Sequence, residues 1–309
     1  MATEASKVWC RQNSEKAIRL YFESLTADVS AVDWAAAIAA SNQLVDAALL
    51  ASDQLRDIGA GLSQSAAHMR VFRHALAPPK SQDQFKILCK EWPKTSEKRG
   101  VGLKKAIASS CAEIISAWLD KRACPWLSEN RETTAQELWA FKSALSALIA
   151  SQEVSTATRN RLAATQESQV VTLLLEAAWT RLPSKLIDKR GEVPVQHFMH
   201  KTRFATGTST PQEVDIACGL PNALVLAMEC KVTNDGTNSV KRINDVLKKA
   251  NAWRAHYGNF IQTAAMLQGV IKPKDVERLI DADVKVFWSH DISDFGSWLN
   301  ERLSTGANP

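Results

Sequence analysis

The sequence predicts an α+β protein in which an all-helical N-terminal region precedes a mixed sheet flanked by helices. Residues 1–155 place apolar side chains three and four positions apart, which is the spacing of amphipathic helices. From residue 156 on, a long helical run is followed by short apolar segments separated by turns and further helices. We therefore expect two regions, residues 1–155 and residues 156–309.

The N-terminal region shows helical spacing most clearly at residues 31–55, 103–122 and 135–151. Pro78, Pro79 and the irregular stretch 91–102 interrupt the pattern, because proline and glycine disfavour helix interiors. We find no repeat and no series of strand-forming residues there. This half is predicted to be helical throughout.

The C-terminal region alternates helical and strand-like segments. In chain order we expect a helix at 158–182, strands at 193–204, 213–218 and 223–232, a helix at 240–256, a strand at 260–271, a helix at 273–281, a strand at 284–290 and a helix at 294–303. Asn238 or Ser239 is expected to cap the helix at 240–256. A hairpin followed by helical crossovers predicts a mixed sheet with helices on its faces.

The composition is that of an ordinary globular protein. The 309 residues are 45% hydrophobic and 23% charged. The longest uncharged apolar stretches we find stop far short of the roughly 20 residues that a bilayer span needs, and the first 30 residues lack an apolar signal core. The six cysteines form no CxxC pair, which favours reduced thiols. We expect a cytoplasmic protein without a membrane partner, and His197 with His200 is a weak candidate for zinc.

Basic residues are concentrated in one part of the N-terminal region. Residues 70–105 contain ten Lys and Arg residues against three acidic ones, whereas the whole chain has a net charge of +5. Such a strip can follow a phosphate backbone through counterion release. A solvated helix face with its adjoining loop explains the same charges equally well.

Acidic residues stand in both arms of a predicted hairpin. Asp215 lies in the apolar segment 214–218, and the segment 223–228 runs directly into Glu229 and Lys231. Acids are costly inside apolar strands unless a cation or metal compensates them. Alternation along a strand places Glu229 and Lys231 on one face. If Cys218 opposes Leu224 across a five-residue connection, Asp215 lies diagonal to Glu229, at about 7–8 Å.

Two carboxylates at that separation can hold one hard cation such as Mg²⁺ between them. A magnesium ion with few protein ligands keeps water molecules and neutralises charge that develops on a phosphate. A lysine two residues after the acid can orient the attacking water or stabilise the transition state. The constellation therefore favours hydrolysis of phosphodiester bonds, against the alternative of a structural ion pair between Glu229 and Lys231.

These residues resemble the PD-(D/E)xK nuclease superfamily. Asp215 and the run Glu229-Cys230-Lys231 at a strand end, followed by a helix, have that pattern, although Val214 stands where the pattern has proline. The longer run at 213–257, with MECKVTNDGTNSVKRINDVLKKANAWRAHYG, is similar to the XamI group of type II restriction endonucleases. The resemblance covers residues 160–300 best, so it implies a restriction-endonuclease-like core there.

The resemblance implies cleavage of double-stranded DNA with Mg²⁺, for which Mn²⁺ is a possible substitute. It makes Asp215 and Glu229 metal ligands, together with the backbone carbonyl of Cys230, and Lys231 the catalytic lysine. Members often add an acid from the helix before the sheet. Glu167 is our first candidate for that acid and Glu176 the second, and ordinary helix surface is an equally good explanation of Glu167.

Basic and polar residues near this motif are candidates for DNA contacts. The helix predicted after the strand carries basic residues off its apolar stripe, and its N-terminus favours anions. The candidates for DNA binding are Lys241, Arg242, Lys248, Arg203 and Asn238. A solvated helix face explains the helical ones as well. The helical region 1–155 is then a possible clasp or base-reading element.

A palindromic site would be cut by two copies of one active site, so we expect a homodimer. A restriction system also implies a cognate DNA methyltransferase in the host. The alternatives are a less specific phage-defence or repair nuclease, a catalytically inactive DNA-binding protein of the same fold, and a helical interaction protein with a structural ion pair.

Overall fold

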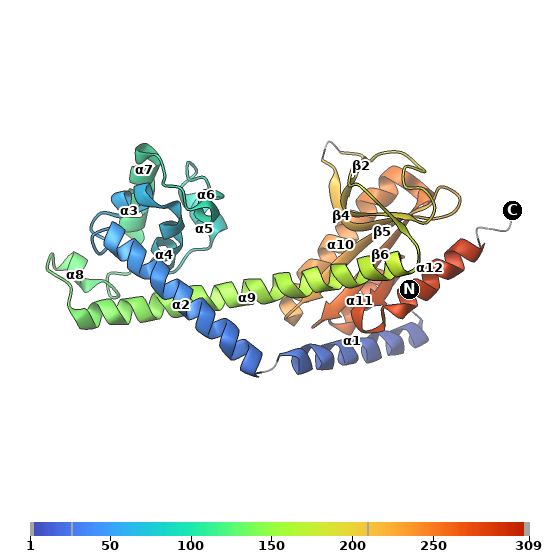
Figure 1. The fold of residues 1–309 in the computed structure, drawn as a ribbon, viewed down its shortest axis with the longest axis horizontal. Coiled ribbons are helices and arrows are strands. Elements are labelled where there is room, and N and C mark those ends of the chain that lie inside the picture. Colours follow the sequence, from blue (N-terminus) through green and yellow to red (C-terminus); the bar gives the residue numbers. More distant parts are fainter. Residues whose placement is uncertain (1–2, 26, 209, 306–309) are drawn as a thin grey trace. The chain divides into compact units, whose positions relative to one another are not determined.

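The computed structural model describes residues 3–25, 27–208 and 210–305, and it divides into two units (Figure 1). Of the described residues, 3–25, 158–208 and 210–305 form the sheet unit, and 27–157 form the helical unit. The predicted α+β class is confirmed, because a seven-stranded sheet in the first unit accompanies a second unit built of helices. The division after residue 157 lies close to the boundary predicted after residue 155. Residues 3–25 belong with the sheet, which the sequence did not predict.

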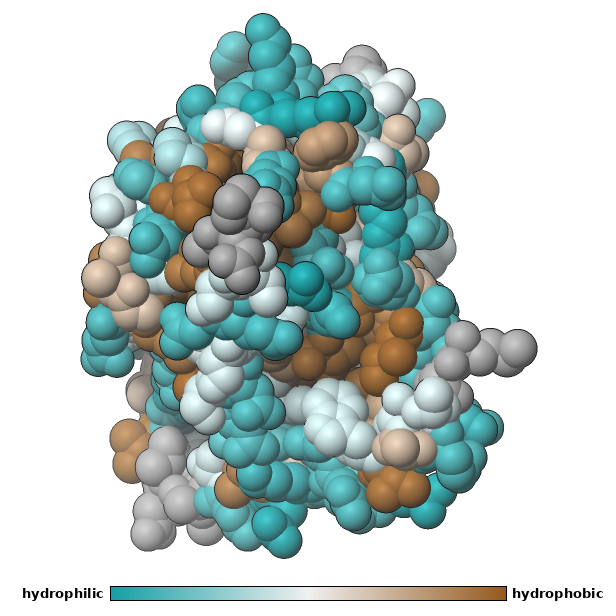
Figure 2. Space-filling view, turned by 90° about the vertical axis from the view of Figure 1, so that its right-hand side faces the viewer, coloured by the Kyte–Doolittle hydropathy of each residue, from teal (hydrophilic) through white to brown (hydrophobic). Residues whose placement is uncertain are grey.

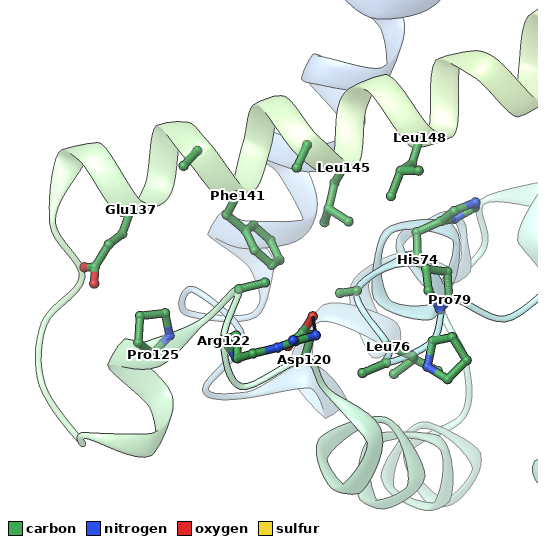
Figure 3. Close-up of a pocket in the computed structure, with 16 residues that line it drawn as sticks. His74, Leu76, Pro79, Asp120, Arg122, Pro125, Glu137, Phe141, Leu145 and Leu148 are labelled. Carbon is green, nitrogen blue, oxygen red and sulfur yellow. Dashed lines mark hydrogen bonds and ion pairs between the residues drawn. The ribbon is translucent and has the colours of Figure 1, made fainter.

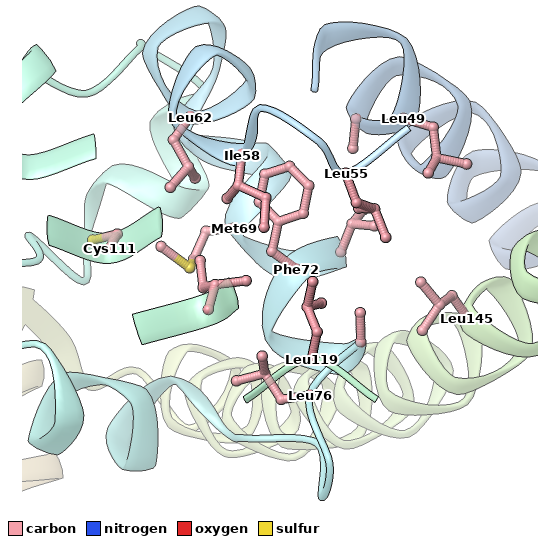
Figure 4. Packing of buried hydrophobic residues seen from close by; sticks show 14 of the residues in the cluster. Leu49, Leu55, Ile58, Leu62, Met69, Phe72, Leu76, Cys111, Leu119 and Leu145 are labelled. Carbon is pink, nitrogen blue, oxygen red and sulfur yellow. The ribbon is translucent and has the colours of Figure 1, made fainter. Parts of the chain in front are cut away.

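The helical unit is built from short helices and one long one. Its elements are α2 (Ala27–Ala51), α3 (Ile58–Gln64), η1 (Ala66–His68), α4 (Met69–His74), α5 (Gln82–Leu88), α6 (Ser96–Arg99), α7 (Lys105–Trp118), α8 (Pro125–Ser128) and the first part of α9 (Ala135–Glu176). Phe72 lies at the centre of its core, among Leu55, Ile58 and Met69 (Figure 4). Burial of such side chains contributes about 1.5–3 kcal/mol each, so this unit has a substantial core of its own.

The basic segment 70–105 is partly neutralised inside the helical unit. Arg73 is 3% exposed, and its guanidinium donates to both carboxylate oxygens of Glu97, at 3.0 and 3.2 Å. Arg70 contacts the same carboxylate, at 3.5 Å. Arg73 also donates to the carbonyl of Lys80, at 3.0 Å. These two arginines therefore hold the fold together, and Arg73 is not available to follow a phosphate backbone.

The helix α2 bears on one expectation from composition. Residues 30–51 are long and apolar enough to cross a membrane by length and composition alone. The expectation from the sequence concerned uncharged stretches, and this helix contains Asp33 and Asp46. In the structure, Val45, Ala48 and Leu49 of this helix are buried in the core of the helical unit.

The face seen in Figure 2 is mainly hydrophilic, with hydrophobic residues gathered in a few patches.

The sheet has the order β1-β3-β4-β5-β6-β7, with β2 pairing β3 beside β1. The strands are β1 (Thr180–Leu182), β2 (Leu186–Ile187), β3 (His197–Phe204), β4 (Gln212–Gly219), β5 (Val225–Thr233), β6 (Ile261–Gly269) and β7 (Lys285–Trp288). The pairs β3–β4 and β4–β5 are antiparallel, and β5–β6 and β6–β7 are parallel. The mixed sheet is as predicted, because a hairpin joins β4 to β5 and helices connect the parallel strands.

Helices cover both faces of this sheet. The second part of α9 and α12 (Ser293–Thr305) pack on one face, through Val170, Leu174 and Phe295. On the other face lie α1 (Glu4–Ser24), α10 (Gly236–Tyr257) and α11 (Pro273–Asp281), and α1 buries Cys10 and Ala17 against it. The short turns η2 (Gly258–Phe260) and η3 (Ser289–Asp291) follow α10 and β7. The sheet unit therefore has three layers, with the strands in the middle.

Three local predictions were wrong. Residues 135–151 and 158–182 were expected as separate helices, but α9 is continuous to Glu176, and Thr180–Leu182 is the edge strand β1. Leu186–Ile187 forms a strand that was not predicted. The helix α10 begins four residues early, at Gly236, because Asp235 caps it by accepting from the backbone N–H groups of Thr237 and Asn238.

Candidate active site

Asp215 lies where the strands β4 and β5 separate. Their pairing ends at Ile216 with Met228. Beyond that pair, the Asp215 carboxylate accepts the backbone N–H of Cys230, at 2.8 Å. A side-chain oxygen thus takes the place of a ladder carbonyl, and it anchors the acid at the fork between the two strands.

The predicted register of this hairpin was wrong by two positions, but its parity was right. Cys218 opposes Leu226, and five residues still connect the last paired positions, Gly219 and Val225. Continuing this register puts Asp215 opposite Glu229 rather than diagonal to it. Directly opposed side chains lie on the same face and closer together than diagonal ones. The two acids lie close together, because the Lys231 Nζ is 2.6 Å from Glu229 Oε2 and 4.0 Å from Asp215 Oδ2.

Glu229 is fully buried on β5, and two ammonium groups hold one of its oxygens. The Oε2 atom accepts from Lys231 at 2.6 Å and from Lys249 at 2.8 Å. The Lys231 Nζ also lies 4.0 Å from Asp215 Oδ2 and 3.6 Å from Asp245 Oδ2. One ammonium thus joins the two acids that the motif predicted, with further charges supplied by the helix α10.

The two acids have pKa values shifted in opposite directions. Burial raises the pKa of Glu229, and the charge of Asp215 adds to the rise, against the opposing effect of Lys231 and Lys249. Burial acts in the same direction on Asp215, but Lys231, Lys201 and the N–H of Cys230 outweigh it and lower its pKa. Pairs of acids whose pKa values are shifted apart in this way are typical of functional sites.

Glu167 joins the cluster from the other face of the sheet. It lies on α9 with its side chain 12% exposed. Its Oε1 accepts from Lys201 at 2.6 Å, and its Oε2 contacts His200 Nε2 at 3.0 Å. The same Lys201 ammonium donates to Asp215 Oδ1 at 2.7 Å. Glu176, the second candidate for the third acid, is exposed and has no contact with this cluster.

These side chains line a cavity of about 250 Å³ in the sheet unit. Its polar lining combines acids and bases from α9, β3, β4, β5 and α10: Arg159, Asn160, Glu167, Lys201, Asp215, Lys231 and Arg242. Three of the four predicted catalytic residues, Glu167, Asp215 and Lys231, line this cavity. The fourth, Glu229, does not line the cavity, but it accepts a hydrogen bond from Lys231, which does.

Residues 53–288 match the sequence profile of the family described as XamI restriction endonuclease. The chain belongs to the XamI restriction endonuclease family. Over 191 residues it is 28% identical to the type II restriction enzyme XamI of Xanthomonas campestris pv. amaranthicola, a match that covers 60% of this chain and 66% of that enzyme. The predicted resemblance is therefore confirmed.

A solved structure is also similar, but more weakly. Protein VC1899 from Vibrio cholerae matches over 84% of this chain and 57% of its own length, with 10% identity and a TM-score of 0.32. Such a score is too low to establish a shared fold. Family membership instead agrees with a core of the PD-(D/E)xK type, which the mixed sheet and the cluster at the fork of β4 and β5 display.

The sequence analysis did not assign three residues of this site: His200, Lys201 and Lys249. Lys201 and His200 lie on β3, and a regular strand would point two consecutive side chains to opposite faces. Lys249 is one of the basic residues off the apolar stripe of α10 and was not predicted to lie at this site, yet it donates to Glu229 and to the carbonyl of Glu213. The signal for Lys249 was its spacing, because it lies two turns after Arg242 on the same helix.

The predicted DNA contacts of the XamI-family chain are dispersed over its sheet unit. Lys241 and Lys248 are exposed on α10, whereas Arg242 is half-buried and lines the cavity. Arg203 is exposed on β3. Asn238 is half-buried in the first turn of α10, where its amide contacts Asn234 and Asp235. The structure thus brings Arg242 to the site and leaves Lys241, Lys248 and Arg203 on the surface.

Among residues 3–25, 27–208 and 210–305, no three His, Cys, Asp or Glu side chains are arranged to hold a metal ion. The lysine ammonium groups explain this, since Lys201 and Lys231 lie between the carboxylates. His197 contacts the carbonyl of Val195 and not a second histidine. The six cysteines are free and buried.

A larger cavity, of about 760 Å³, lies in the helical unit of the XamI-family chain and is separate from this cluster. Phe141, Leu145 and Leu148 of α9 line one side of it, opposite Leu76 and Pro79 (Figure 3). Its polar side chains include the ion pair of Asp120 with Arg122. The lining is mostly apolar and brings together no set of reactive groups comparable to that around Asp215.

Proposed function

We propose that the chain is a type II restriction endonuclease that hydrolyses phosphodiester bonds of double-stranded DNA at a specific sequence, with Mg²⁺ as its metal. One observation carries the proposal. The Lys231 ammonium lies between the carboxylates of Asp215 and Glu229, beside a polar cavity that also contains Glu167. Membership of the XamI family supports the same activity.

The residues present fit a divalent cation. The Oε1 atom of Glu229 is buried and has no hydrogen-bond partner, which is a costly state for a carboxylate oxygen. Carboxylate and carbonyl oxygens are the ligands that Mg²⁺ prefers. Asp215, Glu229 and the backbone carbonyl of Cys230 would hold the ion, with Mn²⁺ as a substitute. When bound, the ion supplies positive charge that neutralises charge on the scissile phosphate.

The side chains of this chain supply the remaining chemistry. Lys231 is kept protonated, since its acidic neighbours raise its pKa although burial acts against them. Its ammonium can donate to a phosphate oxygen or to the attacking water, and so stabilise the negative charge that develops. Glu229 orients this lysine at 2.6 Å, and the N–H of Cys230 orients Asp215. Glu167 supplies the third acid from α9.

Lys241, Arg242, Lys248, Arg203 and Asn238 are the proposed DNA contacts. Arg242 lines the cavity, and we assign it to a phosphate near the scissile bond. Lys241 and Lys248 are exposed on α10, where they can reach the flanking backbone. The helical unit is proposed to clasp DNA or to read bases.

The salt dependence of DNA binding tests the surface lysines. Each phosphate contact contributes about 0.9 to the slope of log affinity against log salt. The double variant Lys241→Ala with Lys248→Ala should therefore lower the magnitude of that slope by about 1.8, the contribution of two phosphate contacts. Fluorescence anisotropy with Ca²⁺ in place of Mg²⁺ measures the slope. Lys7→Ala on α1, whose lysine pairs with Glu4, is the control and should leave the slope unchanged. An unchanged slope in the double variant would remove both residues from the interface.

The proposed partners follow from this activity. Two copies of the chain would cut the two strands of a palindromic site, so a homodimer is proposed. A host methyltransferase would protect the same site in cellular DNA, as a phage-defence system requires. Six free, buried thiols suit a reducing cytoplasm.

Incubation of the full chain with Mg²⁺ and unmethylated phage DNA, followed by sequencing of the ends, tests the proposal. We expect discrete termini at one short sequence, and no cleavage in the presence of EDTA. A smear of random ends would favour a less specific nuclease. Intact DNA in a varied panel, with DNA binding retained, would favour a catalytically inactive DNA-binding protein.

A further inference from the structure

Lys201 holds the position between two acids of the site. Its Nζ lies 2.7 Å from Asp215 Oδ1 and 2.6 Å from Glu167 Oε1. Calcium binds carboxylate oxygens at about 2.3–2.6 Å. The ammonium nitrogen therefore lies close to the distances that Ca²⁺ would have from the same two oxygens, and it carries a positive charge.

The backbone at Lys201 is bent in a way that directs the side chain to this place. Its φ is +55°, in the left-handed region that residues other than glycine rarely adopt. His200 and Lys201 are consecutive, yet both contact Glu167. Regular alternation would separate them, so the irregular backbone is what brings both to one acid. Such local strain is commonly found at functional sites.

The same point reverses the alternation along both neighbouring strands. Phe198 and Phe204 of β3 are both even-numbered, but Phe198 packs with Ile216 on the α9 side whereas Phe204 packs with Trp253 of α10. Lys201 and Asp215 are skipped in the β3–β4 pairing between Thr202–Val214 and His200–Ile216. The two residues thus face each other at an interruption of the sheet.

The Lys201 side chain is freer than that of Lys231 to move out of the cavity. The Lys201 side chain is 55% exposed, whereas that of Lys231 is 10% exposed and contacts three carboxylates. A long, half-exposed lysine can change rotamer at little cost to the core. Lys231 is fixed by comparison, so the two lysines at this cavity are suited to different tasks.

We propose that Lys201 is an internal counter-ion of Asp215 and Glu167 that competes with the divalent cation of the site for Asp215. It screens the repulsion of these acids without metal, and it swings away when a cation takes its place. This inference rests on the proposed function, because it concerns the cation of that reaction. It makes Lys201 a positioning residue that sets how much metal the site needs.

Calcium binding measured by isothermal titration calorimetry tests the competition. The Lys201→Met variant removes the charge and keeps most of the side-chain length, so its Kd for Ca²⁺ should fall by about tenfold. Lys201→Arg keeps a cation at the place and should retain a Kd close to the wild-type value. The matched control is Lys16→Met, whose lysine is 40% exposed and donates to both oxygens of Asp291 in the same unit.

Thermal unfolding supplies a second measurement that does not depend on activity. In EDTA, Lys201→Met should have a lower Tm than the wild type, since Asp215 and Glu167 are left without their shared cation. Adding Ca²⁺ should raise the Tm of this variant more than that of the wild type. Lys16→Met should show equal calcium shifts to the wild type.

An equal or weaker affinity in Lys201→Met, or no Ca²⁺ binding to either protein, overturns the inference. DNA cleavage by the wild type is scored separately. Tighter calcium binding in the variant with no cleavage by the wild type would uphold the role of Lys201 and remove the nuclease. DNA cleavage by the wild type with unchanged calcium affinity in the variant would support the nuclease and overturn the role of Lys201.

Discussion

Asp215→Asn is expected to lower the rate of DNA cleavage at least 10²–10³-fold, an order of magnitude typical of a lost electrostatic contact at an active site. Asparagine has nearly the shape of aspartate, and its carbonyl oxygen can still accept the N–H of Cys230, which lies 2.8 Å away in the native protein. The variant removes the charge that Lys201 and Lys231 now contact and that a divalent ion would need. Single-turnover cleavage of a DNA substrate with Mg²⁺ measures the effect.

Asp294→Asn is the matched control, because Asp294 is an exposed acid in the first turn of α12, distant in sequence from the site. It should cleave at the wild-type rate. Retention of DNA binding and of the circular dichroism spectrum would show that Asp215→Asn acts on the chemical step. Wild-type cleavage by Asp215→Asn would contradict the assignment of this residue, whatever the fate of Glu229 and Lys231.

Arg73→Met is expected to destabilise the helical unit by about 3–5 kcal/mol, because it leaves the buried charge of Glu97 without its main partner. Glu97 is 2% exposed and accepts two hydrogen bonds from the Arg73 guanidinium. The methionine also leaves the carbonyl of Lys80 without its donor. Urea unfolding followed by tryptophan fluorescence measures the change, since Trp92 and Trp126 are buried in this unit.

Lys94→Met provides the comparison within the same basic segment. Lys94 pairs with Asp83, whose side chain is exposed, and such surface pairs contribute about 0–1 kcal/mol. A loss of less than about 1 kcal/mol in Arg73→Met would contradict the structural role of the arginine, and its charge would then be free to contact DNA. A large loss of stability in Arg73→Met but not in Lys94→Met would show that Arg73 serves the fold. Fewer basic residues of the segment 70–105 would then be available to contact phosphates than its composition suggests.

The order of elements in the sheet unit could be predicted because it depends on local patterns. The helix predicted at 273–281 coincides with α11, where Pro273 starts the helix and apolar residues follow at helical spacing. The strands before and after α10 and the closing helix α12 were also in place. The predictions failed at 135–182, where nothing local separates a continuous helix from two, and where edge pairing with β3 makes a strand of residues 180–182.

The candidate site divides in the same way. Asp215, Glu229 and Lys231 were identified because acids in apolar strands are costly and because their spacing has a known use. Glu167 was one of two acids at comparable positions on one helix, and its contact with Lys201 singled it out. Lys201 carried no signal, since it acquires its partners from other elements, whereas the spacing of Lys249 after Arg242 was a signal that the prediction did not use. The function of these residues remains a prediction of the proposals above.

The amino-acid sequence alone determined most of the helical and strand-forming segments, the parity of the β4–β5 hairpin and the identity of the paired acids. These features depend on the preferences of neighbouring residues, which interact along the chain. Tertiary structure decided the register of the hairpin, the bend at Lys201, the docking of α1 on the sheet and the ammonium groups between the acids. Each of these depends on contacts between residues far apart in sequence, whose free energies no local pattern contains.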